Sequence, residues 1–426
     1  MKKWLSFLLV VCLMMPFASF AEEPIAEEGA ELTIMGGAHL VSVTEIVLKD
    51  FMAAHPEIKI NFEKYSYAEY PIKMRTQMSM EEPTPDVLLV HDAFIRQFVD
   101  AGYLLPLDDM IDRSEYLDVF SVVEKDGNTY GLPNQCSNQF VFIYRKDVYE
   151  KLNLTPPTTF DEYFQQALTL KENGYYAGAY DPAVSPEAYY FEPFMYMLGG
   201  TEIDSDGKIV MDKAKEALTL VKQCYDAGIW HCSEQGNSQT FWTAFNEGKI
   251  ACMPSDACHV AYYDSNTDPS GKAYGNMGVA SIFTFGENLP KSIIGNIEYF
   301  AINAKTRYPN AAKILLKYLC QSEEASMKFA DVNENGVMAR YANGYLPGIE
   351  KIINEGGSGS PVYGNEQIVP WLAKNLMETK PQVPLVDART TELRRIVDEV
   401  IAEMLLNGTY TVDTAVEEIL FQAEML

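Results

Sequence analysis

The residues of this chain that could carry out chemistry are mainly carboxylates, since 60 acidic residues stand against 33 basic ones. Two of them, such as Asp92 and Asp256, would suffice for a glycosidase, in which a pair of carboxylates flanks the scissile bond. Such a pair has little specificity in so acidic a chain. The sequence also lacks the Gly-x-Ser-x-Gly, His-Glu-x-x-His and phosphate-loop patterns. We therefore expect no enzymatic activity.

Two histidine–cysteine pairs are the other pattern with chemical potential. His231-Cys232 and Cys258-His259 together offer four side chains of the types that bind zinc. Adjacent residues rarely point toward the same ion, however, so zinc binding by these pairs is the weaker alternative. We expect neither a metal ion nor a cofactor.

The elements that must position a site alternate between strand and helix at the start of the chain. The expected strands are 32–35, 59–62 and 86–90, and the expected helices are 41–51 and 67–80. This alternation indicates parallel strands connected by helices. Ligands of such sheets bind beyond the carboxyl ends of the strands. That rule selects His39, which follows Gly36-Gly37, and Asp92, which follows His91.

The rest of the chain mixes both kinds of element. Further strands are expected at 129–133, 140–144, 250–253, 278–283 and 300–302, with a polar loop after the third of these. Further helices are expected at 160–172, 192–198, 212–227, 240–248, 310–320 and 323–331, and in several segments between 368 and 425. The pattern is that of a mixed α/β protein.

The first residues predict export. Lys2 and Lys3 precede an apolar run over 4–15, and small residues follow up to Ala21, which is the order of a secretory signal peptide. We expect residues 1–21 to be the signal peptide, with cleavage after Ala21 and no lipid on Cys12. The mature chain is then expected to be soluble and periplasmic or extracellular.

Charge and cysteine content limit the partners. A formal net charge of −27 repels phosphate backbones, so we expect no nucleic acid partner. Six cysteines remain after cleavage, and Cys224/Cys232 and Cys252/Cys258 lie close enough in sequence to pair. Buried free thiols are the favoured interpretation, and these two disulfides stay open as alternatives.

Several short motifs carry a resemblance to a known family. They are Pro85-Asp86-Val87 with His91-Asp92, the turn 102–107, Tyr130-Gly131-Leu132-Pro133 leading to 142–147, the helix start 156–162, the segment 245–253, Ala301-Ile302-Asn303, and 310–313 with Leu319. Each motif is degenerate, but their order and spacing over residues 32–425 are specific. The chain resembles the extracellular solute-binding proteins of family 1, which includes the maltose-binding proteins.

The resemblance implies a two-lobed α/β fold, the type II periplasmic-binding-protein fold, in which the chain crosses between the lobes three times. Lobe one is expected at 32–134 plus 293–334, and lobe two at 140–286 plus 336–426. The crossings are expected near 134–139, 292–298 and 334–338.

The resemblance also implies capture of a carbohydrate, in particular an oligosaccharide, in the interlobe cleft for delivery to an ABC-type importer. The implied partners are the permease subunits in the membrane, and the protein is expected to be a monomer. The alternative ligand in the same fold is a polyamine, an amino-acid derivative or another small cation. A secreted glycosidase is a remote alternative.

The family's binding positions suggest which residues contact the ligand. Tyr189 falls where the family places a ring that stacks on sugar, whereas Tyr190 is expected to be core. Where maltose-binding protein has a stacking tryptophan, this chain has Cys258. The expected ligand-binding residues are His39, Asp92, Gln135, Ser137, Tyr189, Asp256, Asn296 (in preference to Glu298) and Trp371.

Overall fold

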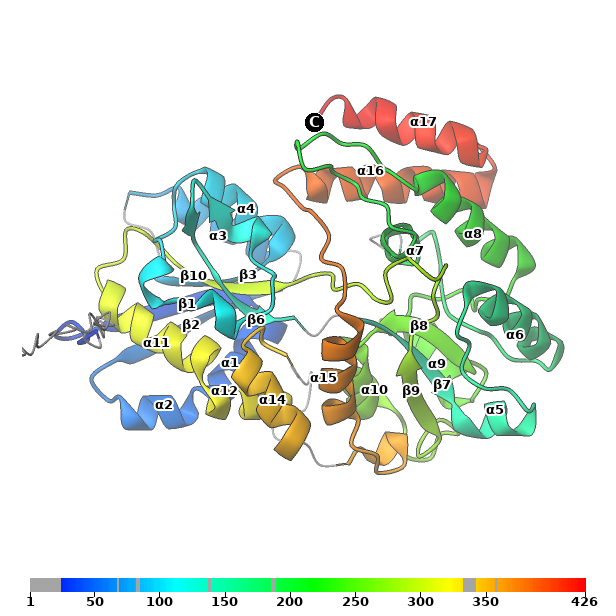
Figure 1. Ribbon diagram of the computed structural model, residues 1–426, viewed down its shortest axis with the longest axis horizontal. Helices are drawn as coiled ribbons and strands as arrows, with labels where there is room; N and C mark the ends of the chain where they lie inside the picture. The colour runs from blue at the N-terminus through cyan, green and yellow to red at the C-terminus, as the bar shows by residue number, and fades with distance from the viewer. Residues whose placement is uncertain are drawn as a thin grey trace, which may run out of the picture.

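The computed structural model describes residues 24–66, 69–81, 85–136, 139–184, 189–236, 238–331, 342–356 and 359–426. These residues form two lobes that lie side by side, with helix α15 (Ile368–Thr379) between them (Figure 1). The two-lobed α/β architecture expected from the sequence is confirmed. The expected signal peptide, Ser137 and the expected crossing at 334–338 lie outside the described residues.

The first lobe is built on a mixed sheet with the strand order β2-β1-β3-β10-β6. These strands are β1 (Glu31–Gly37), β2 (Lys59–Tyr65), β3 (Val87–His91), β6 (Leu132–Gln135) and β10 (Glu298–Ile302). Strand β1 runs parallel to β2 and β3, whereas β10 runs antiparallel to β3 and β6. Every residue of β3 is buried, as expected for a strand covered on both faces.

Helices flank this sheet on both sides (Figure 1). They are α1 (Ala38–Val47), α2 (Lys49–Ala54), α3 (Tyr70–Met78), α4 (Asp92–Asp100), α11 (Pro309–Gln321) and α12 (Glu323–Ala330). A separate two-stranded hairpin consists of β4 (Glu124–Lys125) and β5 (Asn128–Thr129). Gly36 permits the close approach of β1 and β3, because a Cβ there would lie 2.6 Å from the carbonyl oxygen of Leu89.

The second lobe contains the sheet β8-β7-β9, in which the central strand is antiparallel to both neighbours. Its strands are β7 (Phe140–Arg145), β8 (Cys252–Asp256) and β9 (Met277–Ser281). Its helices are α5 (Lys146–Lys151), α6 (Phe160–Glu172), α7 (Phe191–Met197), α8 (Ala214–Ala227), α9 (Gln239–Asn246), α10 (Cys258–Asn266), α16 (Thr390–Ala402) and α17 (Val412–Ala423). Aromatic rings dominate its core, where Tyr163 stacks on Phe283 with centroids 4.7 Å apart.

Hydrogen bonds from the C-terminal part of the chain hold the segments that connect the lobes. In the first crossing, Gln139 donates from Nε2 to the Leu372 carbonyl at 2.8 Å and accepts from Asn375 Nδ2 at 3.0 Å. In the second crossing, the Ser292 carbonyl accepts from the Gln382 backbone N–H, and Ile294 donates to the Gln382 carbonyl. Helix α15 and the strand-like segment after it therefore support both crossings.

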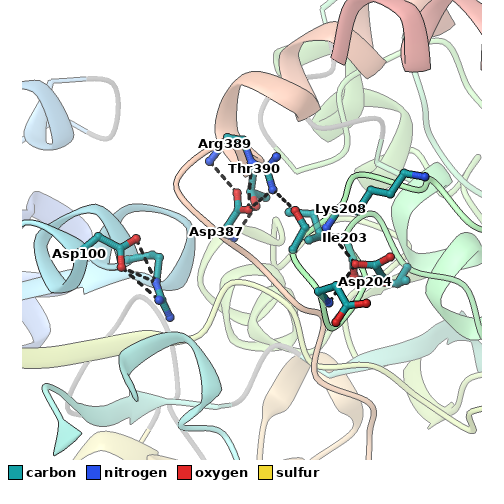
Figure 2. A network of polar contacts seen from close by, with 11 residues as sticks. Asp100, Ile203, Asp204, Lys208, Asp387, Arg389 and Thr390 are labelled. Carbon is teal, nitrogen blue, oxygen red and sulfur yellow. Dashed lines mark hydrogen bonds and ion pairs between the residues drawn. The ribbon is translucent and has the colours of Figure 1, made fainter. Parts of the chain in front are cut away.

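A polar network fixes the start of α16 (Figure 2). The Arg389 guanidinium donates to the Asp387 carboxylate and to the Gly207 carbonyl, and the Asp387 N–H donates to Thr390 Oγ1 at 2.9 Å.

The Asp204 carboxylate closes the 204–208 turn by accepting from the Lys208 N–H. Docking of this turn sets the position of α16, which carries Arg394 one turn further on.

Helix α14 (Leu346–Glu355) departs from the expected domain boundaries. The sequence placed everything after residue 336 in the second lobe. Instead, α14 packs against α12 of the first lobe as well as against α15, and residues 342 and 344 accept hydrogen bonds from the backbone of Cys136 and Leu117. Helix α14 therefore contacts the first lobe, although its residues fall in the range expected for the second lobe. The sequence missed this because the contact joins segments whose pairing no local pattern encodes.

Most expected strands and helices are confirmed to within a few residues. However, the expected strand 129–133 is two strands, β5 and β6, and the expected helix 41–51 is two helices, α1 and α2. The polar loop expected after 253 is also wrong, because β8 continues to Asp256. Helix α10 begins there at Cys258, and helices α4, α5 and α14 were not assigned from the sequence. The six cysteines of the described part of the chain are free thiols, so neither open disulfide forms. Within the described residues, we find no helix whose length and apolar character would let it cross a bilayer.

Candidate functional site

A small polar pocket lies where the second lobe meets the second crossing. We call it the junction pocket. Its volume is about 70 Å³, and it is lined by Tyr189, Glu192, Pro193, Tyr196, Asp256, Ile293, Gly295, Asn296, Pro384 and Arg394. Two larger hollows, of about 480 and 340 Å³, lie elsewhere, one beside α17 and one beside α2. The junction pocket is distinguished from them by an aromatic ring surrounded by charged and amide groups.

The structure brings together three of the residues expected at the site. Tyr189 precedes α7, Asp256 ends β8, and Asn296 lies in the second crossing, yet all three line the junction pocket. Asn296 has φ +50°, a left-handed conformation that asparagine tolerates better than most residues. This turn carries its side chain to the pocket wall just before β10 begins.

Hydrogen bonds hold the Tyr189 side chain by its hydroxyl group. That oxygen accepts from Gln235 Nε2 at 3.1 Å and lies 3.3 Å from both Ser255 Oγ and His259 Nδ1. Gln235 is oriented in turn, because its Oε1 accepts from the hydroxyl of the fully buried Tyr190 at 2.9 Å. Burial and the nearby Asp256 carboxylate raise the pKa of Tyr189 well above its usual range. The phenol is therefore neutral, and its ring is fixed at the pocket wall.

His259 on α10 completes this cluster as a neutral imidazole. Its Nδ1 lies 3.2 Å from Ser255 Oγ. Burial lowers the pKa of His259 to about 4, so the ring carries no charge near pH 7. The group behind Tyr189 is thus made of neutral dipoles.

Arg394 provides a positive charge next to buried carboxylates. Its Nε lies 3.3 Å from Glu192 Oε1 and 3.5 Å from Glu202 Oε1, and Glu202 also accepts from the Tyr196 hydroxyl at 2.6 Å. Burial opposes the arginine's charge, but Glu192 and Glu202 outweigh it and raise the pKa of Arg394 further above its ordinary value. Asp92 of the first lobe adds to this effect. The guanidinium therefore interacts with acids from both lobes.

Asp92 is engaged by the main chain. One carboxylate oxygen accepts from the Ala93 N–H at 2.7 Å, and the other accepts from the Ile297 N–H at 3.1 Å. The Asp92 N–H donates to the Ile297 carbonyl at 2.7 Å. The side chain, only 6% exposed, joins the start of α4 to the second crossing. This placement supports a structural role instead of the expected contact with ligand.

The remaining expected residues do not line the junction pocket among the residues described. Gln135 is buried at the end of β6, opposite Glu298 in the sheet register. Trp371 is half-buried on α15, where it packs against a hydrophobic cluster with members from both lobes. His39 lies on α1, with its ring stacked 6.2 Å from that of His91. Ser137 lies outside the described residues.

Sequence reasoning missed Glu192, Tyr196 and Arg394. The first two had been assigned only as helix residues, and Arg394 belongs to an amphipathic helix in which Arg395 stands beside it. The side chain of Arg394 is 12% exposed and that of Arg395 is 52% exposed. The two arginines differ only in which face of α16 they occupy, and tertiary packing decides which face is buried.

The two histidine–cysteine pairs considered as zinc ligands do not form a cluster. His231 bonds Ser233 Oγ and packs edge-on against Tyr176, whereas His259 belongs to the Tyr189 group. Among the described residues, the cluster of potential ligands close enough to share an ion is His39, His91 and Glu298.

Comparison with known proteins places the chain in context. Residues 37–325 match the family described as bacterial extracellular solute-binding proteins. An uncharacterised ABC transporter extracellular-binding protein of Pyrococcus horikoshii is 30% identical over 210 residues, a match that spans 47% of this chain and about half, 49%, of that protein. A maltotriose-binding protein of Pyrococcus abyssi is 21% identical over 377 residues, covering 85% of this chain and 75% of that protein.

A solved structure is similar over nearly the whole chain. The GacH receptor of Streptomyces glaucescens, studied unliganded and with acarbose, superimposes with a TM-score of 0.73 at 20% identity. The match covers 94% of this chain and 98% of that one. At this identity the likeness establishes the fold.

Proposed function

Because this chain belongs to the family of bacterial extracellular solute-binding proteins, we propose that it captures a carbohydrate between its two lobes and delivers it to an ABC-type importer. The maltotriose-binding relative and the acarbose-binding structural neighbour support a sugar as the ligand. The proposed partners are the permease subunits of that importer. The protein acts as an exported monomer, released from its signal peptide after Ala21.

The convergence of Tyr189, Asp256, Asn296 and Arg394 on one pocket carries this proposal. A sugar presents apolar C–H faces and many hydroxyl groups. An aromatic ring stacks against the former, and charged or amide side chains bond the latter with charge-assisted hydrogen bonds. The junction pocket combines both types of group. A ligand lacking the matching hydroxyls would leave buried polar groups unsatisfied, which is the source of specificity.

Opening of the lobes is part of the mechanism. A cavity of about 70 Å³ is far smaller than the roughly 300–1,000 Å³ of ordinary ligand pockets. A sugar therefore enters only after the lobes move apart, and the crossings at 134–139 and 292–298 are the segments that would rotate. Closure then removes water from both sides of the ligand and repositions Asn296 against it.

No catalytic step is proposed. Of the two carboxylates that a glycosidase pair would need, Asp92 accepts two main-chain hydrogen bonds and Asp256 lines the pocket, and we assign the first a structural role and the second a ligand contact.

A thermal-shift screen tests the proposed ligand class. The mature protein is heated with a panel of mono- and oligosaccharides including maltotriose, and with spermidine and putrescine as the alternative. A sugar at 100 times its Kd should add about 2.7 kcal/mol to stability, a shift of several degrees. A shift given by polyamines and by no sugar would replace the carbohydrate proposal with the cation alternative.

A further inference from the structure

Three potential metal ligands meet at the end of the first-lobe sheet where strands β1 and β3 finish and β10 begins. The donor atoms of His39, His91 and Glu298 all lie within 4.8 Å of one another. His39 comes from the first turn of α1, His91 from the carboxyl end of β3, and Glu298 from the first residue of β10. Three separate elements thus supply two imidazoles and one carboxylate to one point.

Backbone geometry builds this cluster. His91 and Glu298 are direct partners in the antiparallel register of β3 and β10, which brings their Cα atoms together. His39 reaches the same point because β1 lies beside β3 and α1 begins directly after β1. A Cβ on Gly37 would lie 2.7 Å from His39 Cε1, so glycine at this position leaves room for the imidazole.

The cluster is shielded from solvent. Glu298 is 1% exposed, His91 is 6% exposed, and His39 is partly buried. The ring of the buried Tyr70 lies 6.3 Å from that of His91. A buried carboxylate needs polar partners, and the Asn134 amide donates to Glu298 at 3.5 Å. A divalent cation between the three donors would add a positive charge there.

We propose that His39, His91 and Glu298 bind a divalent transition-metal ion, with Zn²⁺ the best match. Two histidine nitrogens and one carboxylate oxygen are a known zinc ligand set that leaves a fourth position open. Zinc–ligand bonds of roughly 2.0–2.2 Å place neighbouring donor atoms about 3.4 Å apart. The three donor atoms here lie within 4.8 Å of one another, so a modest rotation of the side chains would bring them to zinc-binding distance. Mg²⁺ and Ca²⁺ fit less well, because they prefer sites made of oxygen atoms.

This site is distinct from the junction pocket. None of its three residues lines that pocket, although Glu298 follows Asn296 by only two residues. Metal binding would therefore stiffen the strand that leaves the second crossing. The site goes beyond carbohydrate capture and can exist whether or not a sugar is the ligand.

Calorimetric titration of zinc into chelator-treated protein tests the site. The mature chain, without a histidine tag, is compared with His39→Ala, Glu298→Gln and Gly37→Ala. His55→Ala is the matched control, since His55 also lies beside a glutamate but is exposed on the surface. Cys232→Ser removes the exposed thiol. Cobalt added in place of zinc reports the coordination geometry by its visible absorption.

We expect one ion per chain and at least tenfold weaker binding in His39→Ala and Glu298→Gln, with the His55 and Cys232 variants unchanged. Gly37→Ala should weaken binding while leaving all three ligands present. Circular dichroism melts establish that each variant is folded, and the partly exposed His39 is the ligand whose removal should disturb the core least. No stoichiometric uptake by folded wild-type protein, or equal affinity in His39→Ala, would overturn the site.

Sugar binding is measured on the same samples with and without chelator. Retained sugar binding without zinc uptake would refute this inference alone. Zinc uptake without sugar binding would refute the proposed function alone.

Discussion

The Tyr189 hydroxyl accepts a hydrogen bond from Gln235 Nε2 at 3.1 Å, so the side chain is anchored at its polar end while its ring lines the junction pocket. The Gln235 amide is oriented because its Nε2 also donates to the Pro254 carbonyl, which can only accept, while its Oε1 accepts from Tyr190. A binding ring that is already fixed loses little conformational entropy when a ligand stacks on it. The sequence predicted Tyr189 as a stacking ring but not the hydrogen bonds that fix its orientation.

Removal of Arg394 should strongly destabilise the fold. Arg394→Met leaves Glu192 and Glu202 buried without their cation, which typically costs about 3–5 kcal/mol. The matched control is Arg395→Met, whose solvent-exposed ion pairs with Glu392 and Glu399 should contribute little to stability. Urea denaturation measures both variants.

Equal losses of stability in the Arg394→Met and Arg395→Met variants would show that Arg394 compensates no buried charge.

Asp92 is expected to matter for stability. Asp92→Asn replaces one of the two carboxylate oxygens that accept from the Ala93 and Ile297 N–H groups, which should lower the free energy of unfolding by about 1–3 kcal/mol. Asp118→Asn, at a fully exposed side chain, is the control and should change stability little. Unchanged stability in Asp92→Asn combined with weaker sugar binding would restore the original expectation of a ligand contact.

His259 should make the protein less stable in mild acid. Its pKa is about 4 in the folded protein and close to 6.5 when unfolded, so the unfolded chain binds the proton more readily. The stability this group provides is complete above pH 6.5 and is lost as the pH falls toward 4. His259→Asn should reduce the drop in stability between pH 7 and pH 5, whereas the exposed His55→Asn should not. An NMR titration that finds His259 protonated at pH 6 would contradict this account.

Ligand should change the shape of the protein. The junction pocket is too small for a sugar, so the free protein must visit a more open arrangement in solution. Small-angle scattering should give a larger radius of gyration without ligand than at saturation. The same radius in both states, with binding proven by calorimetry, would mean that the crossings at 134–139 and 292–298 do not act as a hinge.

The sequence predicted most of the architecture because its strands and helices carry strong local patterns. The buried run at β3 and the capped start of α6 at Thr159 are examples. Three site residues, Tyr189, Asp256 and Asn296, were also expected from their positions in the family's order of elements.

The rest of the site depends on tertiary contacts. His39 and His91 are 52 residues apart and meet only because β1 pairs with β3. Arg394 and Arg395 differ in burial through the phase of one helix. The Asp92 carboxylate could accept hydrogen bonds from a sugar, but it accepts one from the Ile297 N–H of the second crossing. No local pattern distinguishes these alternatives.

The central claim is that a carbohydrate stacks on Tyr189 in the junction pocket, and isothermal titration of the best sugar from the thermal-shift screen tests it most directly. Tyr189→Ala should weaken binding by about 1–3 kcal/mol, whereas Tyr189→Phe, which keeps the ring, should lose much less. Tyr175→Ala, a partly exposed tyrosine of the same lobe outside the pocket, should bind as wild type does. Wild-type affinity in folded Tyr189→Ala would contradict the account, because the sugar would then bind without the ring that defines the site.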